Sequence, residues 1–192
     1  TVSSSGCELV VPSVAYAEES AQYNFASAQG SKDLQVIPGG ECTGYLYFYN
    51  IDGNRITHIT LEVSQVPDGG EVTIDPPLGE TEVIVNEAPV TVTENLYVEP
   101  SELFTEEPTD VPDGMVSLSI PGRGYALGKA AQITVSVPEA IAIGTTGNIT
   151  IAGVAAWLGQ GGSAAIQQAR DFEFTVTVVS ESDEYTETIP GQ

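Results

Sequence analysis

Apolar and polar residues alternate along most of this chain with a period of two. Residues 59–63, 133–137 and 172–178 each place an apolar side chain at every second position. This spacing is typical of half-buried β-strands, because successive side chains point to opposite faces of a sheet. Further candidate strands recur at short intervals, over residues 71–74, 82–85, 89–93, 115–120 and 148–152. The pattern predicts an all-β protein, a jelly roll or an immunoglobulin-like β-sandwich.

The strongest turn signal is Asp52-Gly53, which lies between two strand patterns. An aspartate-glycine pair favours a type I′ turn, because both central residues of that turn need a positive φ. We therefore expect residues 43–50 and 56–64 to pair antiparallel in a hairpin. The first of these strands is apolar on both faces, which predicts a covered central strand.

Two segments depart from the strand pattern. Residues 162–170 are rich in alanine and predict one or two turns of helix. Residues 94–113 are acidic, contain prolines and have little periodicity, which predicts a long excursion between sheets.

The length of 192 residues suits one domain with a sizeable core. We assign residues 15–192 to a single β-sandwich and residues 1–14 to an N-terminal arm that carries an extended strand. Within the arm, Leu9, Val10 and Val11 form a short apolar run that ends at Pro12.

The formal net charge is −22, from 27 acidic and 5 basic residues. Such a charge excludes the basic surface that binds nucleic acid or anionic membranes, and it favours cationic partners such as Ca²⁺. No apolar run is long enough for membrane insertion. The chain begins at Thr1 without a leader, which leads us to expect a processed, secreted product.

The two cysteines, Cys7 and Cys42, have no companions that would complete a zinc site, so a disulfide is the better interpretation. An intrachain bridge would close a loop of about 35 residues and stabilise the fold by roughly 3–4 kcal/mol. The bridge is expected in an oxidising, extracellular environment, and it lies either within one chain or between neighbouring chains. The sequon that begins at Asn148 is a candidate glycosylation site.

One histidine, two lysines and three arginines cannot assemble most familiar active sites. We therefore expect a scaffold or binding protein and not an enzyme. His58 shares a strand face with Thr60 and is expected to be exposed, whereas Trp157 is expected in the core. The tyrosines at positions 45, 47 and 49 lie on one face and offer a carbohydrate-binding platform, or alternatively a packing surface.

Acidic residues are dense in the 94–113 segment. The candidate metal ligands are Glu106, Glu107, Asp110 and Asp113. Carboxylates in this number could supply oxygen ligands to Ca²⁺, and the alternative is a solvated acidic loop. Residues 50–54 lack the first acidic ligand and the distal glutamate of a calcium loop, so we interpret them as a turn.

The first half of the chain resembles the TasA/camelysin group of secreted biofilm-fibre proteins and the related archaeal bundling pilins. The resemblance rests on Asn24-Phe25-Ala26-Ser27, Ile37-Pro38-Gly39-Gly40, Asn50-Ile51-Asp52-Gly53 and the closing strand at 171–177. It implies a jelly-roll subunit that polymerises by donor-strand complementation, with no enzyme activity.

An exposed sheet edge can accept an extended segment from a partner by strand addition. We therefore expect a structural subunit of an extracellular filament, a homopolymer in which Leu9, Val10 and Val11 form the donor strand. The alternative is a cell-surface adhesion module that binds carbohydrate through the tyrosine face or Trp157.

Overall fold

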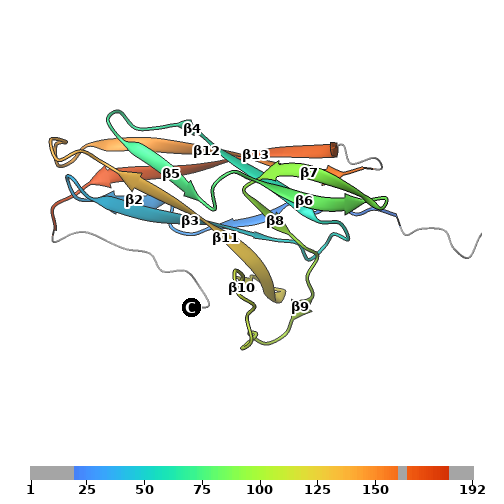
Figure 1. The fold of residues 1–192 in the computed structure, drawn as a ribbon. Coiled ribbons are helices and arrows are strands. Elements are labelled where there is room, and N and C mark those ends of the chain that lie inside the picture. Colours follow the sequence, from blue (N-terminus) through green and yellow to red (C-terminus); the bar gives the residue numbers. More distant parts are fainter. Residues whose placement is uncertain (1–19, 160–163, 182–192) are drawn as a thin grey trace, which may run out of the picture.

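Two β-sheets packed face to face form the body of the protein (Figure 1). The computed structural model describes residues 20–159 and 164–181. The regular structure in these residues is almost entirely β-strand, which confirms the predicted all-β sandwich. The described part of the chain contains no helix that is long and apolar enough to cross a membrane.

The first sheet is built around β11, a strand of 13 residues. Its path is β1 (Ala26–Gln29), β3 (Glu41–Tyr49), β11 (Gly124–Ser136) and β10 (Val116–Ile120), with β5 (Glu71–Asp75) and β9 (Leu103–Phe104) also paired to β11. The C-terminal half of β11 pairs with β3 and β5, and its N-terminal half pairs with β9 and β10. The ladders of this sheet are all antiparallel.

The second sheet is centred on the long hairpin of β12 and β13. Its order is β2 (Asp33–Val36), β13 (Ala164–Val178), β12 (Thr146–Leu158), β4 (Thr57–Gln65) and β8 (Leu96–Val98). All its pairs are antiparallel except β2 with β13, which is parallel. A separate two-stranded ribbon, β6 (Gly79–Val85) and β7 (Ala88–Glu94), makes contacts with β4 of this sheet.

The core lies between the two sheets, where alternate residues of each strand meet. Phe48 packs edge-on against Phe172 of the opposite sheet, with 5.8 Å between ring centroids, and stacks on Phe25 at 6.0 Å. Gly44 leaves room for the ring of Phe174 from the opposite sheet, because a Cβ atom at Gly44 would stand 2.7 Å from that ring. The interdigitated aromatic and branched side chains make this an ordinary sandwich core.

The segment from β1 to β2 changes sheets. Its first part pairs with the end of β3 in the first sheet, and its second part pairs with the end of β13 in the second sheet. The segment therefore runs diagonally along one side of the sandwich. It leaves part of each neighbouring strand without a main-chain partner from this segment.

The predicted hairpin between residues 43–50 and 56–64 is wrong. Both segments are strands, β3 and β4, but they lie in different sheets, and Asp52-Gly53 belongs to the connection between the sheets. Gly53 does not adopt the positive φ of a type I′ turn. The buried Asn50 organises the connection instead, because its Nδ2 donates to the carbonyl oxygens of Arg55 at 2.8 Å and Val98 at 3.4 Å.

The predicted helix over residues 162–170 is also wrong, because the chain is already β13 from Ala164 onward. Pairing with β12 in a 13-residue ladder overrides the helix propensity of the alanines. The excursion over residues 94–113 does connect the two sheets, as predicted. It includes the short strands β8 and β9, which the sequence pattern did not indicate.

Candidate functional site

Several predicted site residues lie outside the described residues. These are the donor-strand residues Leu9, Val10 and Val11, together with Cys7. Cys42 is buried on β3. The donor strand and the disulfide therefore stay predictions.

The tyrosine face does not form an exposed carbohydrate platform. Tyr45 and Tyr47 are buried and pack against Val116, Leu118 and Ile120 of the β10 strand. Both faces of β3 are thus covered, as the apolar pattern predicted. The packing alternative holds for these two tyrosines.

Trp157 is buried, as predicted, at the end of β12. Its Nε1 donates to the hydroxyl of Thr57 at 2.9 Å, and its ring lies 5.2 Å from that of Tyr23. The Thr57 hydroxyl donates in turn to the carbonyl oxygen of Asn24 at 2.8 Å. This network fixes the segment that precedes β1 against the end of the sandwich, and it leaves Trp157 no face for a sugar.

The acidic candidates Glu106, Glu107, Asp110 and Asp113 are exposed in the connection between β9 and β10. Within residues 20–159 and 164–181, no three His, Cys, Asp or Glu side chains converge as a group that could hold a metal. Asn148 is exposed on β12, where its side-chain oxygen accepts a hydrogen bond from Thr175 at 3.4 Å. Its glycosylation stays a prediction.

His58 is buried, and the prediction that it is exposed is wrong. It does point away from the core, but the β6–β7 ribbon covers that face of β4. Its Nδ1 lies 2.6 Å from Oε2 of Glu94, the last residue of β7, and the second oxygen of Glu94 has no hydrogen-bond partner among the described residues. Because a carboxylate only accepts, Nδ1 carries the hydrogen. The pair fastens the ribbon to the second sheet.

Lys129 of β11, in the first sheet, lies close to β8 of the second sheet. Its Nζ is 3.6 Å from the ring centroid of Tyr97, a cation–π contact between the sheets. Burial lowers the pKa of the Lys129 amine, and the nearby carboxylates of Glu99 and Glu94 partly oppose that effect. The lysine serves as a structural tie.

The longest open edge in the described part of the sandwich belongs to β13. The β2 strand pairs with β13 only over residues 175–178, so residues 164–174 meet no strand on the side away from β12 among the described residues. The main-chain N–H of Thr175 donates to the carbonyl oxygen of Lys32 at 2.8 Å, on the side away from β12. Along a strand the main-chain N–H and C=O groups of every second residue point to the same side. Gln167, Ala169 and Asp171 therefore present their N–H and C=O groups to the open edge.

Side chains cross the gap between this edge and β1. Arg170 donates to the hydroxyl of Ser27 and to the carbonyl oxygen of Phe25, and its guanidinium lies over the Phe25 ring. From β1, Gln29 donates to the carbonyl oxygen of Glu173 at 2.7 Å. These contacts hold the two sheets together, but no strand among the described residues pairs with the outer side of β13, away from β12, between Ala164 and Asp171.

Most of the open edge, residues 164–170, lies in a segment without acidic residues, and Asp171 and Glu173 follow toward its end. Residues 140–170 contain no Asp or Glu, whereas 27 acidic residues in 192 correspond to about four in a stretch of 31 residues. The edge begins at the end of the sandwich formed by the β3–β4 connection (50–56), the β6–β7 turn and the start of β13, which we call the arm pole (Figure 1). The described chain also begins there, since the Asn54 amide donates to the carbonyl oxygen of Ser20 at 2.9 Å.

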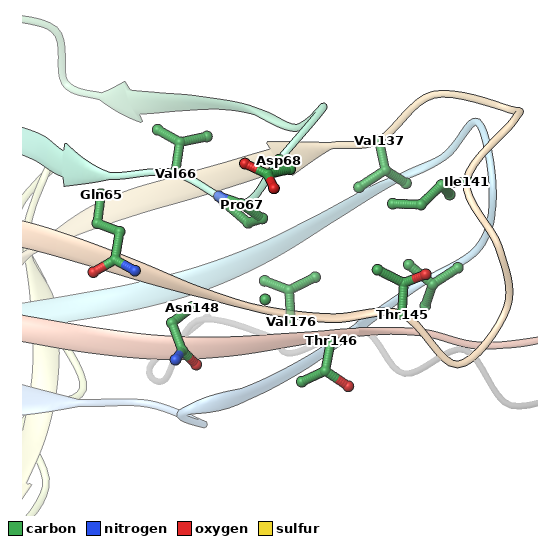
Figure 2. A pocket seen from close by; sticks show the side chains of 12 residues that line it. Gln65, Val66, Pro67, Asp68, Val137, Ile141, Thr145, Thr146, Asn148 and Val176 are labelled. Carbon is green, nitrogen blue, oxygen red and sulfur yellow. The ribbon is translucent and has the colours of Figure 1, made fainter.

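The opposite end, which we call the pocket pole, is formed by the β4–β5 loop (66–70) and the β11–β12 loop (137–145). It holds a pocket of about 280 Å³, shown in Figure 2. Its walls are apolar at Val137, Ile141 and Val176, and Asp68 lies at its rim. The pocket contains no grouping of acid, base and nucleophile.

Comparison with known proteins identifies no family. No protein-family model matches the sequence, and no curated protein matches it either. One similar solved structure is AvmM, which catalyses macrocyclization in alchivemycin A biosynthesis. It is 13% identical, has a TM-score of 0.36, and the match covers 84% of this chain and 93% of AvmM.

A second similar structure is AggA, the major subunit of aggregative adherence fimbriae type I from Escherichia coli. It is 8% identical, has a TM-score of 0.34, and the match covers 85% of this chain and 98% of AggA. Likenesses at this level support neither an activity nor an assembly. The resemblance to the TasA/camelysin group stays a prediction.

Proposed function

We propose that this protein is the subunit of an extracellular filament, a pilus or biofilm fibre, and that the N-terminal arm of one copy adds a strand to the next. The observation that carries the proposal is the open edge of β13 over residues 164–174. The proposal gives the chain no catalytic role and no cofactor.

The edge supplies what strand addition requires. The outward N–H and C=O groups at Gln167, Ala169 and Asp171 can each pair with an extended segment. Each such bond contributes about 1 kcal/mol net, so a ladder along this edge contributes several kcal/mol before any side chain is buried. An exposed edge of this length is otherwise prone to indiscriminate pairing, which a dedicated donor strand would prevent.

The N-terminal arm is a suitable donor. Nineteen residues precede Ser20 in the sequence, and an extended segment of that length spans about 60 Å. The direction of the chain supports donation to another copy. The β2 strand runs parallel to β13, so a segment that continued backward from Ser20 along the same line would pass the start of β13 and leave its own sandwich.

Charge also favours this pairing of surfaces. A net charge of −22 opposes association of identical chains. The first seventeen residues carry one acidic residue, Glu8, and residues 140–170 carry none. The donor and residues 164–170 of the acceptor edge can therefore meet with little repulsion, although the end of that edge carries Asp171 and Glu173. Leu9, Val10 and Val11 would add apolar burial.

A proline at position 169 tests the acceptor edge. Ala169→Pro removes an outward N–H without breaking the β12 ladder, because proline is tolerated on an edge strand. The matched control, Ala169→Thr, keeps the N–H and adds a β-branched side chain on the exposed face. We expect wild type and the threonine variant to form fibres visible by negative-stain microscopy, and the proline variant to remain a folded monomer. Fibres of the proline variant at the wild-type concentration would contradict the proposal.

The alternative of a carbohydrate-binding module has less support. Its candidate residues Tyr45, Tyr47 and Trp157 are at most 7% exposed, so they cannot stack on a sugar without unfolding the core. The third tyrosine of the predicted platform, Tyr49, is half-buried against the same cluster and does not form a platform alone.

A further inference from the structure

Five of the seven large apolar side chains that are exposed among the described residues lie at the two poles, and the other two are Leu78 and Leu103. Tyr23, Ile84 and Ile166 are 39%, 65% and 41% exposed, and all three belong to the arm pole. Val66 and Ile143, 42% and 64% exposed, belong to the loops of the pocket pole. The nine residues of β4 separate the two ends by about 30 Å. Exposed apolar surface concentrated at both ends of the long axis indicates contacts along that axis.

The pocket pole has the shape of an acceptor. Its pocket has Val137, Ile141 and Val176 in its walls, and Val66 also borders it (Figure 2). A volume of about 280 Å³ leaves room for a branched aliphatic side chain. The arm pole presents such side chains on a projecting ribbon, since Ile84 lies next to the turn at Asn86 that joins β6 and β7.

The charges of the two poles differ. The pocket pole carries exposed carboxylates at its rim and on the strands that start there: Glu41, Asp68, Glu71 and Glu139. Three of the five basic residues of the chain, Arg55, Arg123 and Arg170, lie on or next to the arm pole, where the exposed carboxylates of Asp52 and Glu87 also lie, so the charge of this pole is mixed. Two pocket poles would therefore repel each other, whereas a pocket pole can face an arm pole.

We infer that the pocket pole of one copy receives the arm pole of the next, with Ile84 and Ile166 packed against Val66, Ile143 and the pocket. This inference rests on the proposed filament function and identifies the occupant of the pocket as a second copy of this chain. The two contacting surfaces are different, so the contact is heterologous and continues into an open filament instead of closing a dimer.

The experiment measures the critical concentration for filament assembly by pelleting. Ile143→Glu adds a carboxylate to the pocket pole. The side chain of Ile143 is 64% exposed, so its replacement should have little effect on folding. The variant is expected to raise the critical concentration about tenfold, the equivalent of losing the burial of one isoleucine. Ile84→Arg combined with Ile143→Glu is expected to restore assembly to within about threefold of wild type, because the new charges are opposite.

The matched control is Leu78→Glu, which adds the same charge at a residue that is 58% exposed in the connection between β5 and β6. It is expected to change the critical concentration less than about twofold, since an isolated surface charge has little effect. If Ile143→Glu behaves like Leu78→Glu while wild type forms filaments, the proposed contact between the pocket pole and the arm pole is overturned and the filament function stands. If wild type forms no filaments at any concentration, the filament function fails and this inference fails with it.

Discussion

The buried pair of His58 and Glu94 leads to the most quantitative prediction about the fold. The side chains are 6% and 2% exposed, and the pair joins β4 to the last residue of the β6–β7 ribbon. His58→Ala leaves the carboxylate of Glu94 buried with neither oxygen partnered. Leaving a buried carboxylate without its partner costs roughly 3–5 kcal/mol. For a domain of this size that corresponds to a fall in the melting temperature of roughly 6–20 °C.

The assay combines thermal unfolding with hydrogen exchange. We expect His58→Ala to lower the melting temperature by this amount and to increase exchange over the ribbon, residues 79–94, more than over β12. The double variant His58→Leu with Glu94→Leu is the control, because replacing both partners with apolar residues is often neutral. If His58→Ala costs less than about 1 kcal/mol, the carboxylate is solvated and the ribbon is not fastened as described.

Two further predictions concern the core and an exposed ion pair. Gly44→Ala places a Cβ atom 2.7 Å from Phe174, so we expect it to lower the free energy of unfolding, measured by chemical denaturation, by about 1–3 kcal/mol. The control Gly79→Ala, where a Cβ atom has nothing within 4 Å, should change stability by less than about 0.5 kcal/mol. Equal effects of the two variants would show that the sheets relax at Gly44. The hydrogen bonds from Arg123 hold the pKa of Asp52 below its usual value, so their stabilisation is present at neutral pH and is lost as the pH falls through that lowered pKa. The melting-temperature difference between wild type and Arg123→Gln should therefore vanish in acid, and a difference that persists at pH 2 would refute this origin.

Most strands could be predicted from the sequence, but their partners could not. Alternation identifies a strand from its own residues, as it does for β3 and β4. Pairing depends on segments far away in sequence, since β3 lies between residues 26–29 and residues 124–136. The Asp52-Gly53 signal was misleading because the buried amide of Asn50, and not the turn sequence, sets the path of that connection.

The site could be predicted only in part. The alternation correctly placed His58 on the outward face of β4, but nothing nearby indicates that the β6–β7 ribbon covers that face. The first part of the open edge of β13, residues 164–170, did leave a signal in the sequence, the absence of Asp and Glu between residues 140 and 170 in a strongly acidic chain. The predicted helix over residues 162–170 concealed that signal, because an alanine-rich segment favours a helix until its pairing with β12 is known.

The most direct test of the central claim is a cryo-electron microscopy map of the assembled native protein at a resolution that shows side chains. We predict an extra strand beside β13, paired with Gln167, Ala169 and Asp171, whose side chains fit Leu9, Val10 and Val11 of a neighbouring copy. A map in which this edge of β13 remains open, or is covered by the arm of its own chain, would contradict the account.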